Sequence, residues 1–202
     1  MDAPRIARNL ERIREQIGPD VEICAAIKYV NLVDLPELAA GGITLVGENR
    51  AQDMLAKHDA HGGLFAGWDF IGALQSRKVR DVAPLARLIH SVASESALGQ
   101  LAKHPAKEVL LEVNVAGEEG KAGIAPHELP EYLERCPVPV SGLMTMPPFA
   151  ERPEDSRPHF ARLAELAAEH GLAKLSMGTT QDYEVAVQEG ATIVRLGTVL
   201  YA

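Results

Sequence analysis

The chain has 202 residues, of which 47% are hydrophobic, and a formal net charge of −8 at pH 7. That length and apolar content suffice for one well-buried core, so we expect residues 1–202 to form a single domain. The negative charge argues against a sequence-independent nucleic-acid binder, because such a protein neutralises phosphates with a basic stripe. A small anionic ligand is compatible with it, since a local pocket can be positive on an acidic protein.

Three features of the chain point to a cytoplasmic protein. Cys24 and Cys136 form no disulfide framework and no CxxC motif, which favours reduced thiols. Residues 1–18, MDAPRIARNLERIREQIG, contain no apolar signal-peptide core and predict an amphipathic helix. The sequence contains no apolar run long enough to predict a membrane span.

Short β-like runs alternate with helical patterns along the rest of the chain. The predicted strands are Val21–Ala26, Ile43–Val46, Trp68–Ile71, Leu88–Val92, Val109–Val115, Val140–Met144, Lys174–Met177 and Thr192–Leu196. The predicted helices between them are Leu35–Ala40, Arg50–His58, Ser76–Leu85, Glu95–His104, Pro126–Arg135, Pro153–His170 and Gln181–Glu189. We expect no helix after the last strand, where the chain reads RLGTVLYA.

This alternation with short connections predicts an α/β fold with parallel strands and right-handed crossovers. Eight strands favour a closed (β/α)8 barrel of the TIM type, in which the N-terminal helix takes the place of a missing last helix. An open doubly wound sheet is the alternative that the alternation leaves open. In a barrel, the chemistry is expected at the C-terminal ends of the strands.

The first two predicted strand ends carry candidate site residues. Lys28 ends the first strand in the apolar stretch EICAAIKYV, and Asn49 follows the second strand. A lysine buried there could be a point charge for a phosphate, an ion-pair partner of Glu48 or a Schiff-base amine, since burial lowers the pKa of an ammonium group. Asn49, taken alone, reads more readily as a helix cap or a turn residue than as a ligand contact.

Two stretches near the C-terminus predict a phosphate site. LSMGTTQDYEVAVQEG reads as a strand, a turn at Gly178 and a helix opening one or two residues later, where free amides and the helix dipole favour an anion. RLGTVL adds Gly197 and Thr198 just past the last strand, and loops after strands seven and eight commonly hold phosphate in barrel enzymes. The alternative is that Thr179 and Asp182 are merely a helix-capping pair.

Several motifs occur in an order that resembles one known family. They are AAIKYV, GENRAQD, WDFIGALQSRK, LLEVNVAGEEGKAG, VSGLMTM and LSMGTTQDYEVAVQEGATIVRLGT. Together they resemble the pyridoxal 5′-phosphate (PLP) homeostasis family, whose members are single-domain proteins similar to the barrel half of alanine racemase. The resemblance covers nearly the whole chain from Val21 onward and implies a (β/α)8 barrel with PLP held as a Schiff base on Lys28.

The resemblance also implies the other cofactor-binding residues. Beside Lys28 they are Asn49, Ser176, Gly178, Thr180, Arg195, Gly197 and Thr198. Arg195 would face the pyridine nitrogen of PLP, Asn49 would line the cofactor, and the remaining residues would hold the phosphate. It implies no catalytic residue and no metal ligand in this chain.

The sequence departs from the family pattern at three of these motifs. IKY stands where the family usually has SKT, GALQSRK where it has GHLQSNK, and SMGTTQD where it has SMGMSxD. Thr180 retains a hydroxyl, so its assignment to the phosphate is unaffected. Roles of the replaced side chains do not carry over to Ile27, Tyr29 and Ala73. Because side chains alternate along a strand, we expect Tyr29 to point toward the helices.

The chemistry of the implied site favours binding over turnover. A guanidinium offers only donors, so Arg195 against the pyridine nitrogen keeps that nitrogen unprotonated and makes the ring a poor electron sink. Racemisation also needs a second acid-base group across the cofactor from the lysine. In alanine racemases a second domain contributes it, and this chain ends at Ala202 without such a domain.

We therefore predict a monomeric carrier that stores PLP and passes it to apo-enzymes, without robust turnover and without nucleic-acid or membrane partners. Two alternatives stay open. One is a PLP-dependent amino acid racemase or lyase that receives a catalytic residue from a partner chain. The other is a PLP-free barrel enzyme that acts on a metabolite phosphate, with Lys28 as a Schiff base to its substrate.

Overall fold

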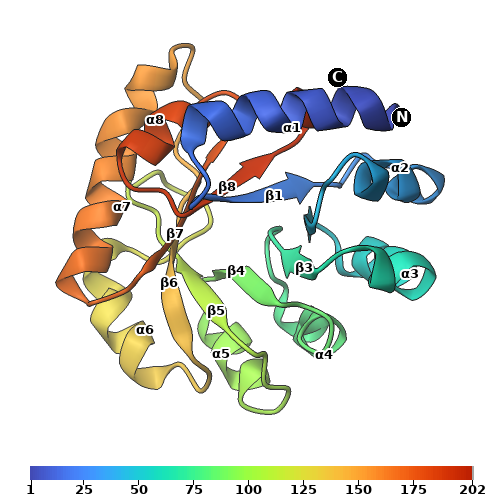
Figure 1. Ribbon diagram of the computed structural model, residues 1–202. Helices are drawn as coiled ribbons and strands as arrows, with labels where there is room; N and C mark the ends of the chain where they lie inside the picture. The colour runs from blue at the N-terminus through green and yellow to red at the C-terminus, as the bar shows by residue number, and fades with distance from the viewer. Residues whose placement is uncertain (202) are drawn as a thin grey trace.

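Eight parallel strands close into a barrel in the order of the chain (Figure 1). The computed structural model describes residues 1–201. Its strands are β1 Glu22–Ala26, β2 Leu45–Glu48, β3 Gly67–Phe70, β4 Leu88–Val92, β5 Val109–Glu112, β6 Val140–Met144, β7 Lys174–Thr179 and β8 Ile193–Leu196. β8 pairs with β1 from Ile193 opposite Glu22 to Leu196 opposite Ala25. This last pairing confirms the barrel and excludes the open sheet.

Helices follow the strands and surround the barrel (Figure 1). They are α1 Ala3–Ile17, α2 Leu35–Ala40, α3 Ala51–His61, α4 Val79–Val82, α5 Glu95–Leu101, α6 Leu129–Arg135, α7 Arg157–Glu169, α8 Tyr183–Gln188 and α9 Thr198–Tyr201. Short 3₁₀ turns are η1 Leu32–Asp34, η2 Gly62–Leu64, η3 Ser76–Lys78, η4 Pro126–Glu128 and η5 Pro153–Ser156. The expectation that no helix follows the last strand was wrong, because α9 forms there.

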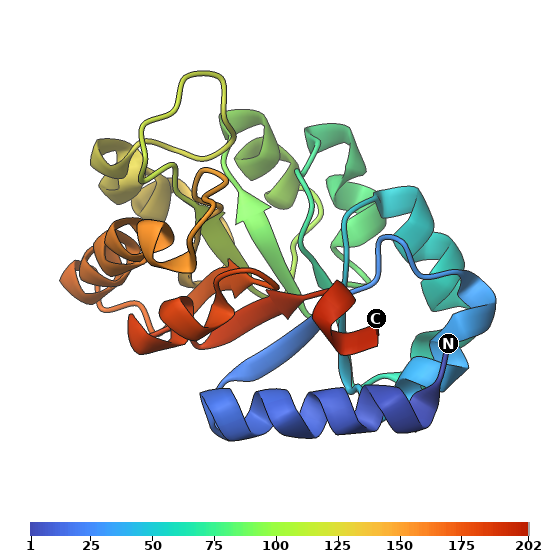
Figure 2. The ribbon, with the colours of Figure 1, turned by 90° about the horizontal axis from the view of Figure 1, so that it is seen from above.

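The N-terminal helix α1 completes the outer ring, as predicted. It lies beside β1 and β8 in Figures 1 and 2 and contacts α2, α8 and α9. Its apolar stripe is buried at Ile6, Ile13 and Ile17, and the side-chain amide of Asn9 donates a 3.1 Å hydrogen bond to the carbonyl oxygen of Leu200. These contacts join the two ends of the chain.

The buried side chains form two layers. A small cluster fills the barrel interior and consists of Cys24, Leu45, Leu88, Leu110, Met144 and Ile193. A larger cluster packs between the strands and the helices. This arrangement follows from strand alternation, because successive side chains point to opposite faces of the barrel wall. Within residues 1–201, no helix combines the length and the apolar character that crossing a membrane requires.

Candidate functional site

A cavity of about 700 Å³ opens at the C-terminal ends of the strands. Every strand contributes a residue at or just past its end: Ala26, Asn49, Gly72, Ser91, Glu112, Met144, Thr179 and Arg195. This is the end at which barrel enzymes carry their chemistry. Lys28, Thr180, Gly197 and Thr198 line the same cavity, so the structure brings these four predicted site residues together.

Lys28 lies in the cavity wall, but it is not buried. β1 ends at Ala26, and the chain turns at residues 28–29, where the Val30 amide donates to the Ile27 carbonyl oxygen. Lys28 is therefore exposed at the rim, while Ile27 is fully buried. The prediction of a strand residue buried among apolar side chains was wrong, because the strand ends two residues earlier.

Tyr29 also differs from the expectation. Its side chain is 84% exposed and lines the cavity beside Lys28 instead of packing toward the helices. The Lys28 ammonium nitrogen lies 4.9 Å from the centre of the Tyr29 ring, within the range of a cation–π contact. Strand alternation does not reach Tyr29, because this residue belongs to the turn after β1.

Glu48 is not a partner of Lys28. Its carboxylate is fully buried and pairs with the Lys57 ammonium group at 2.5 Å, and it also accepts the Asn49 amide at 2.6 Å. The ion-pair role considered for Lys28 is thereby taken by Lys57. The side-chain oxygen of Asn49 is buried without a hydrogen-bond partner in residues 1–201, and Asn49 lines the cavity. A buried side-chain oxygen without a partner can accept a hydrogen bond from a bound ligand.

The loops after β7 and β8 meet at one side of the cavity. The Thr180 hydroxyl accepts a 3.2 Å hydrogen bond from the Gly197 amide, which ties the two loops together. Asp182 accepts the Thr179 amide at 2.7 Å, but α8 begins only at Tyr183 and has no side-chain cap. This pair therefore closes the turn before α8 and is not a helix cap. Thr180 and Thr198 remain as cavity-lining hydroxyl residues at the predicted phosphate position.

Gly178 serves the helix packing and is not among the cavity-lining residues. Its φ of +89° lies in the region that favours glycine, and an added Cβ would come within 2.6 Å of the Ala186 Cβ in α8. The sequence predicts a turn at this glycine, but Gly178 lies inside β7 and the turn begins only at Thr180. In the structure Gly178 approaches α8 closely, and it does not line the cavity.

Ser176 is not among the residues that line the cavity, and its predicted phosphate contact stays a prediction. Its hydroxyl lies inside the barrel, fully buried, at 2.8 Å from His90 Nδ1 and next to the Arg195 guanidinium. The opposite ring nitrogen of His90 lies 3.0 Å from Asp69. Although this places Ser, His and Asp in series, the arrangement is no hydrolytic site, because the hydroxyl has no access to a substrate.

Arg195 reaches from β8 across the barrel interior to the cavity. Its NH1 group donates to the carbonyl oxygen of Ser176 at 2.8 Å and to the Ser176 hydroxyl at 2.5 Å. Its NH2 group donates to the Thr145 carbonyl oxygen at 2.9 Å and contacts the Met146 sulfur at 2.8 Å. Burial lowers the pKa of Arg195 below its ordinary value, and the side chain remains a guanidinium cation.

Glu112 is a cavity residue that the sequence analysis missed. It ends β5, is 7% exposed and lines the cavity, and its carboxyl group has no hydrogen bond within the described chain. Burial raises its pKa above 4.5, against the lowering effect of Arg195 and Lys121. An acidic residue inside the apolar run VLLEV was the available signal. Asp69 and His90, in the runs GWDFIG and LIHSV, carried the same signal.

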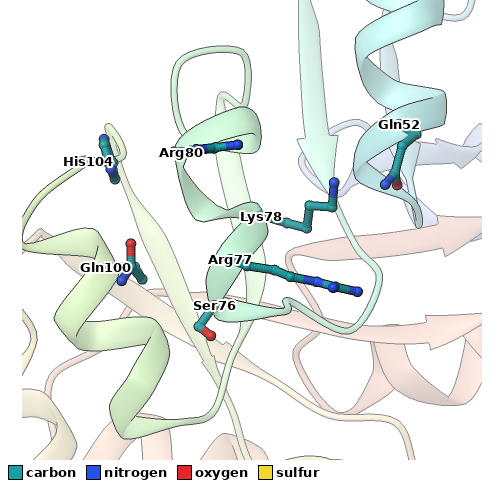
Figure 3. Close-up of a pocket in the computed structure, with 7 residues that line it drawn as sticks. All are labelled: Gln52, Ser76, Arg77, Lys78, Arg80, Gln100 and His104. Atoms are coloured by element: carbon teal, nitrogen blue, oxygen red, sulfur yellow. The ribbon is translucent and has the colours of Figure 1, made fainter.

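A second cavity lies outside the barrel and has a different character. It measures about 560 Å³ and is lined by Gln52, Ser76, Arg77, Lys78, Arg80, Gln100 and His104. Figure 3 shows that these side chains point in different directions and do not converge on one position. Asp81 partly neutralises the cluster through ion pairs with Lys78 and Arg80. The motif GALQSRK thus contributes both to the barrel cavity, through Gly72 and Ala73, and to this outer surface.

The comparisons with known proteins agree with this geometry. The sequence matches the alanine racemase N-terminal domain family over residues 1–202. The chain belongs to this family. It is 42% identical to the pyridoxal phosphate homeostasis protein of Aquifex aeolicus, over 98% of this chain and 96% of that protein. It is 38% identical to the protein of the same name in Pseudomonas aeruginosa, over 98% and 94% of the two chains.

The fold also matches a solved relative of this alanine racemase-like family. The structure of PipY from Synechococcus elongatus, determined with PLP bound, superimposes with a TM-score of 0.84 at 32% identity. The match covers 98% of this chain and all of PipY. The predicted family and the predicted alanine racemase-like barrel are both confirmed.

Proposed function

We propose that this protein binds PLP in the barrel cavity and serves intracellular PLP homeostasis by storing and delivering the cofactor. The single observation that carries the proposal is the cavity itself. It joins the amine of Lys28, the hydroxyl residues Thr180 and Thr198 and the guanidinium of Arg195 in one space of about 700 Å³. The names of the relatives and the PLP bound to PipY support the same function. Residues 1–202 would act as one cofactor-binding domain.

The residues present fit PLP. The unpaired side-chain oxygen of Asn49 and the unpaired Nε–H of Arg195, both counted within residues 1–201, are polar groups that a polar ring can satisfy. We infer that Arg195 faces the pyridine nitrogen and that Thr180, Gly197 and Thr198 hold the phosphate. Gly178 would support the phosphate loop through its close packing against α8, and Ser176 would support Arg195, so both would act indirectly.

Lys28 is the proposed covalent anchor. When PLP is bound, its aldehyde supplies an electrophilic carbon to which the Lys28 amine adds, a carbon–nitrogen double bond forms and one water leaves. The exposure of Lys28 makes this amine accessible to incoming cofactor and to amines that take the cofactor away. Reversible access suits a protein that delivers PLP.

The test compares Lys28→Ala with Lys121→Ala. Lys121 lies outside the cavity and pairs with Glu118, so its removal is a matched control for the loss of one lysine. Lys28→Ala is expected to lose the absorption band of lysine-bound PLP and the borohydride-reducible adduct while it keeps its fold by circular dichroism. Lys121→Ala is expected to keep both signals. Borohydride labelling of another lysine in the wild type would contradict the assignment.

Catalytic turnover is the second candidate function, and one observation favours it. In a closed barrel of eight strands β5 lies opposite β1, so Glu112 faces the cavity from the side opposite Lys28. A PLP-dependent amino acid racemase needs two proton-carrying groups placed across the cofactor. The carboxyl group of Glu112 is one such group, and this chain supplies it without a second domain.

Proton exchange separates the two candidates. PLP-loaded wild type and Glu112→Gln are incubated with L-alanine and L-serine in deuterated water, and loss of the α-proton is followed by NMR. We expect slow or absent exchange, because the guanidinium of Arg195 makes the pyridine ring a poor electron sink. Exchange at about 1 s⁻¹ or faster that disappears in Glu112→Gln would establish the racemase instead.

We further propose that the protein acts as a cytoplasmic monomer and that its partners are PLP-dependent apo-enzymes. Cys24 and Cys136 are both free thiols, which suits a reducing compartment. Size-exclusion chromatography with light scattering tests the monomer. Transfer is tested by adding PLP-loaded protein to an apo-enzyme and measuring the recovered activity against an equal concentration of free PLP.

A further inference from the structure

A continuous series of side-chain contacts runs through the barrel interior to Arg195. Arg87 donates to both carboxylate oxygens of Asp69, at 2.9 and 2.8 Å. Asp69 contacts His90 at 3.0 Å, His90 contacts the Ser176 hydroxyl at 2.8 Å, and this hydroxyl contacts Arg195 at 2.5 Å. Arg87 directly precedes β4, and the other members come from β3, β4, β7 and β8; Asp69, His90 and Ser176 are fully buried.

From Arg195 through Ser176 and His90 the protons of this series all point toward Asp69, and Arg87 donates to Asp69 from the other end. Burial alone would raise the pKa of Asp69, but the hydrogen bonds and charges of Arg87 and His90 bring it below its ordinary value, so Asp69 is an ionised acceptor. His90 must then donate from Nε2. Burial lowers the pKa of His90 despite the nearby carboxylate, so the ring is neutral and its Nδ1 accepts the proton of the Ser176 hydroxyl. The hydroxyl oxygen in turn accepts from Arg195.

This direction determines how Arg195 can be oriented. A guanidinium has five N–H donors, and four of those of Arg195 are directed at Ser176, Thr145 and Met146. The fifth, on Nε, has no partner among residues 1–201. The Ser176 hydroxyl donates its proton to His90, so its oxygen accepts an N–H of the Arg195 NH1 group. This hydrogen bond holds the NH1 side of the guanidinium away from the cavity.

We propose that Asp69 and His90 are positioning residues that act through Ser176 to hold Arg195 so that its Nε–H is the donor presented to the cofactor ring. The inference rests on the proposed function, because the cofactor is PLP in both. Neither Asp69 nor His90 lines the cavity. They therefore act on bound PLP through Ser176 and Arg195 and do not contact it.

A double-mutant cycle tests the transmission. Ser176→Ala removes the hydroxyl that receives the Arg195 N–H, and His90→Phe removes both ring nitrogens while it keeps an aromatic ring. Each variant is expected to bind PLP about fivefold to tenfold more weakly and to shift the absorption band of bound PLP. The double variant is expected to bind PLP no more weakly than the weaker-binding single variant, because both changes interrupt the same series of contacts.

Glu22→Gln is the matched control. Glu22 binds the same Arg87 at 2.9 Å but does not touch His90. The Glu22→Gln variant is therefore expected to keep the wild-type affinity for PLP and the wild-type absorption spectrum of bound PLP. Ser176→Thr keeps the hydroxyl and is expected to restore the wild-type band. Thermal unfolding of each PLP-free variant verifies the fold, and His90→Asn replaces His90→Phe if the latter does not fold.

A measurement without PLP tests where the protons lie in this series of contacts. Nitrogen-15 NMR of the PLP-free wild type is expected to show neutral His90 with its proton on Nε2. A proton on Nδ1, an unchanged PLP band in Ser176→Ala, or additive losses in the double variant would each overturn the inference. Absence of any PLP band in the wild type would instead overturn the proposed function, while the NMR result would still stand.

Discussion

At the scale of single residues, the cavity holds charged groups with different surroundings. Lys28 is exposed at the rim, whereas Glu112 is nearly fully buried and lacks a hydrogen-bond partner in residues 1–201. An ionised carboxylate in such a place loses hydration that the charges of Arg195 and Lys121 compensate only in part. The pKa of Glu112 is raised for this reason. Glu112 is thus a destabilising group whenever it is ionised.

The raised pKa of Glu112 predicts a pH dependence of stability. The folded protein holds the Glu112 proton more tightly than the unfolded chain, so the stabilisation is complete below about pH 4.5 and is lost as the pH rises through the folded pKa. The loss amounts to about 1.4 kcal/mol for each unit of pKa shift. Glu112→Gln cannot ionise and is expected to remove this loss.

Urea unfolding of the PLP-free protein from pH 4 to 8 measures this difference. The free energy of unfolding of Glu112→Gln minus that of the wild type should increase with pH. Glu118→Gln, a change at a half-exposed carboxylate on the following loop, provides the control and should show no comparable trend. A constant difference across the pH range would rule out a raised pKa for Glu112.

At the scale of elements, the loops after β7 and β8 form one unit. The hydrogen bond from the Gly197 amide to the Thr180 hydroxyl links them, and the absence of a side chain at Gly178 lets the end of β7 approach α8 closely. The Asp182 side chain stabilises the turn by accepting the Thr179 amide. The loop residues that face the cavity are held in place by these contacts, which come from two different strand ends.

If these loops hold the phosphate, pyridoxal without its phosphate should bind far more weakly than PLP. Charge-assisted hydrogen bonds contribute about 1.5–3 kcal/mol each, so the loss of two of them lowers affinity by about a hundredfold or more. Equilibrium dialysis with both ligands measures the ratio. Equal affinities would move the phosphate site away from Thr180 and Thr198.

Gly178→Ala is expected to destabilise the protein by about 2–4 kcal/mol, because it combines a left-handed φ with a steric clash against α8. Gly171→Ala is the matched control. Gly171 also has a positive φ, of +65°, but an added Cβ meets no atom within 4 Å. This change should cost only about 1–2 kcal/mol. Urea unfolding of both variants gives the comparison, and equal losses would argue against tight packing at Gly178.

At the scale of the whole molecule, α1 completes the ring between α8 and α2 (Figure 2). It lies beside β1 and β8, the two strands whose pairing closes the barrel (Figure 1). The buried isoleucines of α1 and its hydrogen bond to the carbonyl oxygen of Leu200 make the N-terminal helix part of the barrel core. Barrel closure and cavity shape therefore depend on the first 17 residues.

Ile13→Ala is expected to lower the free energy of unfolding by about 2–5 kcal/mol, because Ile13 is fully buried and its truncation leaves a cavity under the helix. Glu15→Ala, at an exposed position of the same helix, controls for helix propensity and should change stability by about 0.5 kcal/mol or less. Denaturant unfolding measures both. Similar values for the two variants would mean that α1 is not an integral part of the core.

The sequence by itself determined the architecture of this protein. The alternation of eight apolar runs with helical patterns predicted every strand to within a few residues, because strand and helix periodicities are local properties of the chain. The order of the motifs identified the family, and the glycine and hydroxyl residues after the last two strands pointed to the side of the cavity where Thr180, Gly197 and Thr198 lie.

Only the tertiary structure decided how the side chains are used. Lys28 and Tyr29 lie just beyond a strand end, where alternation no longer determines direction, and the turn exposes both of them. Barrel closure brings β3, β4, β7 and β8 together around one interior. For this reason the Ser176 hydroxyl contacts His90 and Arg195. No local pattern encodes such a contact between residues that lie up to 86 positions apart.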